Sequence, residues 1–258
     1  HIIGRIGQSG WMIILVTATE QLPYKEKWVE KLTQQIPQVE TIVHNVNGKR
    51  TNVILGPKNN ILYGDGTITD HIKDLQFTLS PHSFFQVNPE QTTVLYDQAL
   101  EYADLKGDET VIDAYCGTGT ISLFLAHKAK HVIGIEIVEP AIINARENAK
   151  RNGYDNTEFI VADAAVEMPK LYKAGVRPDV IVFDPIRAGC KEEVLTSAAG
   201  MEPKRIVYVS CNPATMARDI EILTHYGYEL QEVQPVDMFP MTAHVEAVAL
   251  LTRNNVTQ

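Results

Sequence analysis

The sequence predicts an α/β protein in which a doubly wound parallel sheet follows a small antiparallel α+β module. Three observations carry this prediction. Strands and helices alternate from about residue 88 onward, and a glycine-rich turn follows the first of those strands. The first 75 residues hold short strand-like runs without that alternation. We therefore divide the chain into residues 1–75 and residues 76–258.

The first region reads as short strands around one helix. A strand is expected at 11–17, after a Ser-Gly turn, and another at 41–46, ending at Asn-Gly. Between them, 24–35 carries helix-forming Lys and Glu with apolar residues on one face. By itself this region contains no motif that indicates a catalytic function. Further short strands are expected at 52–55, at 61–63 and, as a pair, over 68–79.

The second region alternates apolar strands with helical segments of roughly 10–15 residues, which indicates βαβ units and a parallel sheet. Such sheets bind ligands beyond the carboxyl ends of their strands, so the residues that follow each strand are the candidates for a site. We expect strands at 110–115, 131–136, 158–162, 180–184, 205–210, 229–235 and 246–251, and helices at 89–103, 119–128, 139–152, 192–199 and 214–225.

Composition narrows the class of protein. The 258 residues are 45% apolar and carry a net charge of −9, which argues against a generic basic nucleic-acid binder but leaves a local basic patch open. Three cysteines, an odd number without CxxC or zinc spacing, indicate no disulfide framework, no metal site and a reducing, cytoplasmic location. No apolar run is long enough to span a membrane. The sequence shows no signal peptide. Because the chain opens with His1 rather than Met and enters a strand-like run at once, we expect a fragment of a longer protein.

The glycine turn is the first candidate site. Gly117 and Gly119 let the backbone turn sharply and approach a ligand, although Ser122 stands where a dinucleotide fingerprint would have a third glycine. Glu136, 19 residues after Gly117, ends the second strand and can accept hydrogen bonds from both ribose hydroxyls. The plainer alternatives are a tight βα turn and a solvated carboxylate.

Asp163 follows the third strand, where a carboxylate suits an adenine amino group or simply caps the next helix. Acids stand at the ends of the first three strands (Asp113, Glu136 and Asp163), together with a glycine turn but without a pyrophosphate clamp. This combination fits S-adenosylmethionine better than NAD. That cofactor has an adenosine but no phosphates to cradle.

The later strand ends carry reactive groups. Asp184 can hydrogen-bond a base edge or the cofactor. Methyltransferases that act on exocyclic amines carry two prolines and an aromatic residue after such an acid, whereas this chain has one proline and an arginine, so we do not expect an exocyclic amine as the methyl acceptor. Cys211 follows the strand 205–210 and is either a nucleophile or an inert buried thiol. A free thiol is only about 3% ionised at neutral pH, so the site must lower its pKa or take the proton during attack. Glu246 opens the last strand and is either a base or a surface charge.

Five motifs occur in one order along the chain, namely Ser83–Asn88, Asp113–Gly119, Asp184–Gly189, Ser210–Thr215 and Phe239–Glu246. Together they resemble the RNA (uracil-5-)-methyltransferase family, which makes 5-methyluridine in tRNA and ribosomal RNA. The resemblance covers about residues 76–253, and residues 1–75 are similar to the family's central, RNA-contacting module.

The resemblance implies a role for each matching residue. Cys211 would be the nucleophile, Glu246 the base, and Asp184 a further residue of the catalytic set. Ile186 stands where the family usually has a second proline, which loosens an otherwise rigid turn. The residues implied to bind S-adenosylmethionine, and its product S-adenosylhomocysteine, are Gln86, Tyr115, Gly117, Thr120, Glu136, Asp163 and Asp184.

The resemblance also implies a reaction. A methyl group would pass from S-adenosylmethionine to C5 of a uridine in RNA, through a covalent bond between Cys211 and C6 of uracil that Glu246 helps to resolve. We expect 23S ribosomal RNA ahead of tRNA as substrate, and a cytoplasmic monomer without membrane association. The TRAM domain and the iron–sulfur cluster that some members carry are not found in this sequence.

Three other functions stay open. The first is a methyltransferase acting on a non-RNA substrate, for which Cys211 would be incidental. The second is an RNA cytosine C5-methyltransferase, although the sequence places only one cysteine well for catalysis. The third is an RNA-binding remnant without activity, against which the intact set of motifs argues.

Overall fold

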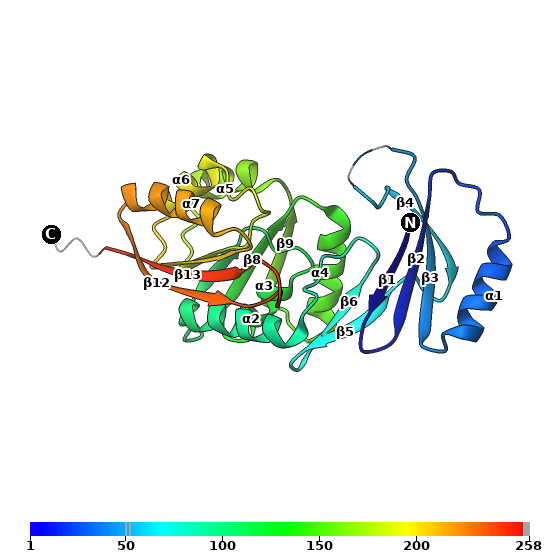
Figure 1. The fold of residues 1–258 in the computed structure, drawn as a ribbon. Coiled ribbons are helices and arrows are strands. Elements are labelled where there is room, and N and C mark those ends of the chain that lie inside the picture. Colours follow the sequence, from blue (N-terminus) through cyan, green and yellow to red (C-terminus); the bar gives the residue numbers. More distant parts are fainter. Residues whose placement is uncertain (50, 52, 255–258) are drawn as a thin grey trace. The chain divides into compact units, whose positions relative to one another are not determined.

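The computed structural model describes residues 1–49, 51 and 53–254. The chain forms two compact units, His1–Ser83 and Phe84–Gln258 (Figure 1). A hairpin crosses residue 75 and belongs to the first unit, so the division of the chain falls a few residues beyond that point. Of the strand expected at 52–55, residue 52 lies outside the described residues, and 53–55 do not form a strand.

The first unit contains a four-stranded sheet in the order β1 (Ile2–Ile6), β2 (Trp11–Thr17), β3 (Val39–Val46) and β4 (Lys58–Tyr63). The outer pairs and the separate hairpin of β5 (Ile68–Ile72) and β6 (Leu75–Leu79) are antiparallel, as predicted. β2 and β3, however, are parallel, because α1 (Lys25–Gln35) returns the chain to the end at which β2 began.

The second unit is built on seven strands in the order β12-β13-β11-β10-β7-β8-β9. Strands β7 to β11 are parallel, and β13 runs antiparallel to both of its neighbours, which confirms the doubly wound sheet. The strands are β7 (Thr110–Asp113), β8 (His131–Glu136), β9 (Thr157–Val161), β10 (Val180–Phe183), β11 (Arg205–Ser210), β12 (Tyr228–Val236) and β13 (Glu246–Arg253).

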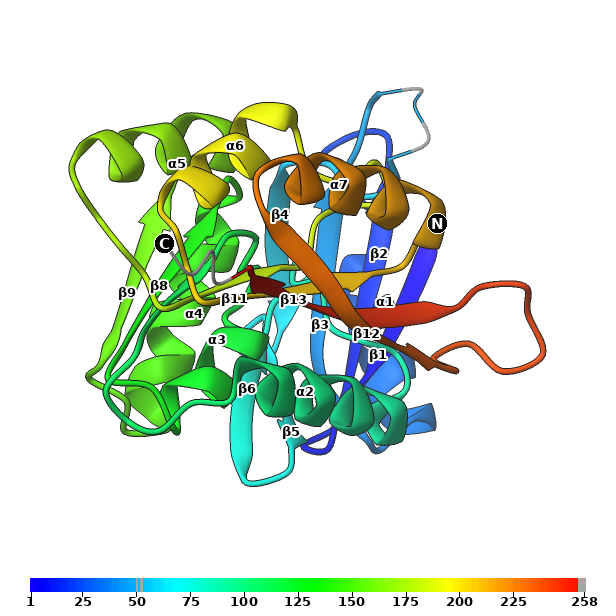
Figure 2. The same cartoon turned by 90° about the vertical axis from the view of Figure 1, so that its left-hand side faces the viewer.

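Helices cover both faces of this sheet, with α2 to α4 on one face and α5 to α7 on the other (Figure 2). Helix α5 is absent from the sequence prediction because Pro169 lies inside it and obscures its helical pattern. The helices are α2 (Pro89–Ala103), α3 (Thr120–Ala126), α4 (Glu139–Arg151), α5 (Ala164–Lys173), α6 (Glu192–Gly200) and α7 (Pro213–His225).

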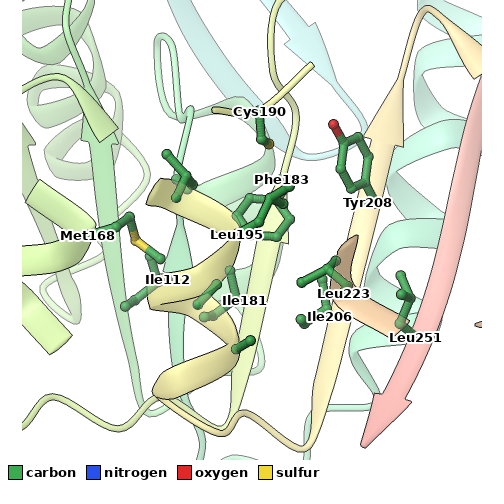
Figure 3. Packing of buried hydrophobic residues seen from close by; sticks show 14 of the residues in the cluster. Ile112, Met168, Ile181, Phe183, Cys190, Leu195, Ile206, Tyr208, Leu223 and Leu251 are labelled. Carbon is green, nitrogen blue, oxygen red and sulfur yellow. The ribbon is translucent and has the colours of Figure 1, made fainter. Parts of the chain in front are cut away.

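The main core lies between the sheet and the helices α5 to α7 (Figure 3). Strand β10 reads Val-Ile-Val-Phe and is buried along its whole length, as expected for a parallel strand covered on both faces. Ile181, Phe183 and Leu195 are fully buried, so truncating any of them to alanine should cost roughly 2–5 kcal/mol. This core makes the sheet a firm support for the side chains at its edge.

The chain order places a topological switch point at that edge. From β7 the chain moves outward to β8 and β9, then returns to the other side of β7 to form β10 and β11. The connections on the two sides therefore diverge between β7 and β10. At such a switch point the carboxyl ends of the strands leave room for a ligand.

Candidate active site

The turn between β7 and α3 presents two glycines in left-handed backbone conformations, and they serve different purposes. Gly117 has φ +53°, and a Cβ atom there would meet nothing within 4 Å, so this peptide faces open space. Gly119 has φ +81°, and its Cβ would lie 3.1 Å from Ala145 and 3.3 Å from Phe159. Gly117 thus leaves the backbone open to a ligand, whereas Gly119 allows close packing of the turn.

Glu136, at the end of β8, is held against this turn. Its Oε2 accepts a hydrogen bond from Gly117 N at 3.3 Å, and its Oε1 accepts one from Val138 N at 2.8 Å. Two backbone donors therefore fix the carboxylate that the sequence predicts to bind a ribose. The predicted pair of Gly117 and Glu136 is brought together.

Asp113, the last residue of β7, is fully buried beneath the turn. Its Oδ2 accepts a 2.6 Å hydrogen bond from Ser122 Oγ, while its Oδ1 has no partner among the described residues. Burial raises the pKa of Asp113 to about 6. An unpartnered buried carboxylate oxygen costs free energy, which a polar ligand group could repay.

Asp163 follows β9 and caps α5, since its Oδ1 accepts a hydrogen bond from Ala165 N at 2.9 Å. Its Oδ2 forms an ion pair with Lys191 Nζ at 2.9 Å. The hydrogen bond from Lys191 lowers the pKa of this carboxyl below its usual range. The helix-cap alternative left open by the sequence is therefore present, and both oxygens have partners within the protein.

Tyr96, on α2, is a buried polar residue that sequence reasoning missed. The residue is 3% exposed, and its phenol group donates a 3.2 Å hydrogen bond to Thr120 Oγ1. Burial, together with the nearby charges of Asp184 and Glu246, raises its pKa. In the sequence, a tyrosine on an apolar helix face reads only as core, so no signal distinguished it.

Strand register brings the reactive groups together. Ser210 pairs with Ala247 across β11 and β13, so Cys211 and Glu246 both lie one residue beyond the same pair. Asp184 directly follows β10, whose Phe183 pairs with Tyr208 of β11. The last parallel strands and the antiparallel β13 therefore deliver three predicted catalytic residues to one edge.

The electrostatics of these three groups show that they share one environment. Burial raises the pKa of Asp184 well above its usual value, and the charges of Glu246 and Asp113 raise it further. Burial also raises the pKa of Glu246. For Cys211, burial comes first, followed by the charges of Glu246 and Asp184, and all three raise the thiol pKa. Among the described residues, none donates a hydrogen bond to the carboxylates of Asp184 or Glu246.

Cys211 differs from the other two cysteines in its exposure. Cys116 and Cys190 are buried, whereas Cys211 is partly exposed. Arg187 is the cation whose charge lowers the pKa of the Cys211 thiol and so favours the thiolate. A partly exposed thiol beside a guanidinium is chemically accessible, while the carboxylates around it keep the thiolate a minor form at neutral pH.

Two further predicted residues are Tyr115, which lies two residues after β7, and Gln86. Tyr115 is partly buried, and its pKa is raised by burial and by Cys190. Gln86 is 8% exposed, in the segment that leads into α2. That segment is tied to the loop before Glu246, because Asn88 Nδ2 donates a 3.3 Å hydrogen bond to Met238 O.

Across residues 1–49, 51 and 53–254, every helix is too short or too polar to cross a bilayer. Within the same described stretch, His, Cys, Asp and Glu side chains do not gather in threes or more in a way that could hold a metal ion.

Comparisons with known proteins identify a family model and several relatives that match this chain. A model of the tRNA (uracil-5-)-methyltransferase family matches residues 12–254. An uncharacterized RNA methyltransferase of Halalkalibacterium halodurans is 56% identical over 99% of this chain and 56% of its own length. One from Bacillus cereus is 55% identical over 98% of this chain and 55% of its own length. The chain therefore spans about half the length of the curated relatives it matches.

Among solved structures, the Pyrococcus abyssi tRNA (uracil-54, C5)-methyltransferase in complex with S-adenosyl-L-homocysteine is 30% identical, with a TM-score of 0.79. The match covers 97% of this chain and 59% of that one. Because the family model matches almost the whole chain, the chain belongs to the tRNA (uracil-5-)-methyltransferase family.

Proposed function

We propose that residues 76–258 transfer a methyl group from S-adenosylmethionine to C5 of a uridine in RNA, and that residues 1–75 contact the RNA. The observation that carries the proposal is the meeting of Cys211, Asp184 and Glu246 at one sheet edge, beside the open glycine turn. The names of the relatives and of the Pyrococcus abyssi enzyme support this choice.

The switch point between β7 and β10 suits the cofactor on three counts. The peptide at Gly117 is open, the Glu136 carboxylate is held beside it, and one oxygen of Asp113 lacks a partner among the described residues. When bound, S-adenosylmethionine supplies the methyl group as an electrophilic carbon attached to a sulfonium. The residues proposed to hold it are Gln86, Tyr115, Gly117, Thr120, Glu136, Asp163 and Asp184.

Cys211 makes C5 of uracil reactive. The thiol first loses its proton to solvent, to which it is partly exposed. Its thiolate then adds to C6, and the π electrons of the C5–C6 bond move toward O4 to give an enolate, so that C5 becomes electron-rich. C5 is methylated in this state. Without the sulfur bond, C5 is too poor a nucleophile to react.

Asp184 can support the enolate as a hydrogen-bond donor. Burial and neighbouring charges raise its pKa well above the usual value, so its carboxyl group takes up a proton more readily than an exposed aspartate does. When it holds that proton, the carboxyl group can donate a hydrogen bond to an oxygen that gains negative charge, as an oxyanion hole does.

Glu246 completes the reaction as a base. Its carboxylate removes the proton from the methylated C5, the electrons of that C–H bond reform the C5–C6 double bond, and the C6–S bond breaks to release the Cys211 thiolate. Burial raises the pKa of Glu246, which makes its ionised form a stronger base than an exposed glutamate.

The substrate is a uridine that can leave its stack, which costs least in a loop or bulge. We propose 23S ribosomal RNA ahead of tRNA as the substrate, whereas the family model and the Pyrococcus abyssi enzyme carry tRNA in their names. Both RNAs therefore belong in the same assay. We propose that the protein acts as a cytoplasmic monomer.

The test uses the full-length protein, radiolabelled cofactor and unmodified 23S ribosomal RNA and tRNA. We expect 5-methyluridine in one of them. Cys211→Ala should abolish methylation and still bind cofactor, because the thiol makes the first bond to the ring. Glu246→Gln should accumulate a protein–RNA adduct on a denaturing gel, because the C5 proton stays in place.

Glu158→Gln is the matched control, since Glu158 is an exposed carboxylate of β9 whose side chain is 59% exposed. It should turn over like the parent. Full methylation by Cys211→Ala would reject the nucleophile. RNA binding without methyl transfer by the parent would favour a remnant that only binds RNA.

A further inference from the structure

A buried carboxylate under the loop between β10 and α6 (residues 184–191, the β10–α6 loop) has no part in the reaction proposed above. Asp219 of α7 is fully buried. Its Oδ2 accepts hydrogen bonds from Cys190 N at 2.7 Å and from Tyr208 OH at 2.6 Å, and its Oδ1 accepts one from Arg218 Nε at 2.8 Å. A buried carboxylate with this many donors is a fixed anchor rather than a mobile charge.

Arg218 extends the anchor to the loop itself. Its guanidinium forms a 2.6 Å ion pair with Asp219 and also donates to Ala188 O at 3.0 Å and to Cys190 O at 3.3 Å. Two successive residues of α7 therefore bind both donor and acceptor groups of the loop backbone.

The start of α7 binds the same loop at a second point. Arg187 O accepts hydrogen bonds from Asn212 Nδ2 at 3.1 Å and from Thr215 Oγ1 at 3.3 Å. Asn212 directly follows Cys211, and its Oδ1 also caps the helix by accepting from Ala214 N. The turn that carries the thiol and the loop that begins at Asp184 are thus hydrogen-bonded to each other.

The middle of the loop has one turn of its own, in which Gly189 N donates to Ile186 O at 2.8 Å, and its end is held by the ion pair of Lys191 with Asp163. Ile186 is 77% exposed, so its side chain adds little packing. Gly189 has φ +79°, and a Cβ there would lie 2.6 Å from both Arg218 Nη2 and Asp219 Oδ2. The backbone at this point therefore lies directly on the Arg218–Asp219 pair, at a distance that only glycine permits.

We propose that Asp219 and Arg218 are positioning residues, which fix the β10–α6 loop on α7 and so hold Asp184 and Cys211 in the relative positions that attack on the ring requires. The inference rests on the proposed roles of Asp184 and Cys211. Neither Asp219 nor Arg218 needs to touch substrate, because each acts through the backbone of the loop.

The experiment compares Asp219→Asn and Arg218→Gln with the parent in two assays. The first separates kcat and KM for RNA methylation and measures the dissociation constant of S-adenosylhomocysteine. The second follows alkylation of each cysteine by iodoacetamide with mass spectrometry, and this assay needs no methylation activity.

In Asp219→Asn we expect kcat to fall about 10- to 100-fold, as a displacement of about 1 Å at a reacting group can do. Cofactor affinity should stay within about twofold of the parent, and Cys190, a buried residue of the loop that this change loosens, should alkylate faster. A merely structural residue would change stability without this split.

Asp179→Asn is the matched control. Asp179 also accepts a backbone hydrogen bond, from Thr110 N at 3.0 Å, and pairs with Lys204 at 2.9 Å, but it lies at the opposite end of β10. It should keep the parent's kcat and the parent's protection of Cys190.

Parental kcat and unchanged protection of Cys190 in Asp219→Asn would overturn the inference. If Asp219→Asn fails to fold, Arg218→Gln decides by the same two assays, because the Arg218 side chain is 51% exposed and its loss leaves the core intact. If the parent itself methylates no RNA, the proposed function fails, and cysteine alkylation still shows whether the loop is held by α7.

Discussion

The carboxyl edge of the large sheet has two halves that treat their acids differently. In the half formed by β7 to β9, Glu136 and Asp163 accept hydrogen bonds from backbone N–H groups. In the half formed by β10, β11 and β13, Asp184 and Glu246 receive no such bonds among the described residues, and burial raises the pKa of both.

We propose that this difference separates a cofactor-binding half from a catalytic half. Carboxylates already held by backbone donors present fixed acceptors to a ligand and cost little to keep ionised. Carboxyl groups buried without donors destabilise the fold, and that cost is typical of groups that must change protonation or gain a partner during a reaction. Asp113 lies between the two halves, since one of its oxygens is satisfied and the other has no partner among the described residues.

Replacing Asp184 should have the largest effect and therefore tests the comparison between the two halves most directly. We expect Asp184→Ala to lower kcat about 10²- to 10³-fold, the usual cost of losing one donor to a developing oxyanion. Asp184→Asn should recover part of that loss because its amide also donates a hydrogen bond. Single-turnover methylation measures both variants, and equal loss in the two would mean that Asp184 acts as an ionised acceptor.

Asp113→Asn comes next and concerns stability. The folded protein holds the Asp113 proton more tightly than the unfolded chain, with a pKa of about 6 against 3.8, so ionisation opposes folding. Its contribution to stability is therefore lost as the pH rises from about 4 to about 6, at a cost of at most about 3 kcal/mol. The variant should have a higher free energy of unfolding at pH 7 and a similar one at pH 4 in urea titrations. A less stable variant at pH 7 would show that the carboxylate is well compensated.

Glu136→Gln tests the half of the edge formed by β7 to β9, which is proposed to bind the cofactor. Because a hydrogen bond to a charged group contributes about 1.5–3 kcal/mol, cofactor affinity should fall about 10-fold or more by calorimetry with S-adenosylhomocysteine. Alkylation of Cys211 should not change, since the two residues lie in different halves. Asp163→Asn is a milder companion, because Lys191 and the cap of α5 already occupy both oxygens.

The smallest effect is on the Cys211 thiol. Burial and the charges of Glu246 and Asp184 raise its pKa, so the midpoint of its alkylation by iodoacetamide should lie at higher pH than that of a free cysteine. Glu246→Gln should lower the midpoint by removing a negative charge, and Arg187→Gln should raise it. Identical midpoints in the parent, Glu246→Gln and Arg187→Gln would show that these two side chains do not interact with the Cys211 thiol.

Much of this edge could be predicted from the sequence because parallel strands end together. Once the strands were recognised, Gly117 with Glu136, and Cys211 with Glu246, followed from what comes after or before each strand. The remaining features depend on contacts between distant elements. Tyr96 and Asp219 lie on helix faces that read as core and as surface, and only the packing of α2 and α7 shows their hydrogen bonds. The parallel pairing of β2 and β3 could not be read from their apolar patterns, which suit either direction.

The pairing of Ser210 with Ala247 also constrains how the protein can change. A slip of β13 by two residues would leave every side chain on its original face, so the apolar pattern of the strand could not oppose it. It would nevertheless carry the Glu246 carboxylate about 7 Å along the sheet, away from the sulfur. If Glu246 acts on a ring bonded to Cys211, the register at the start of β13 is therefore constrained by chemistry even where folding alone would tolerate a shift.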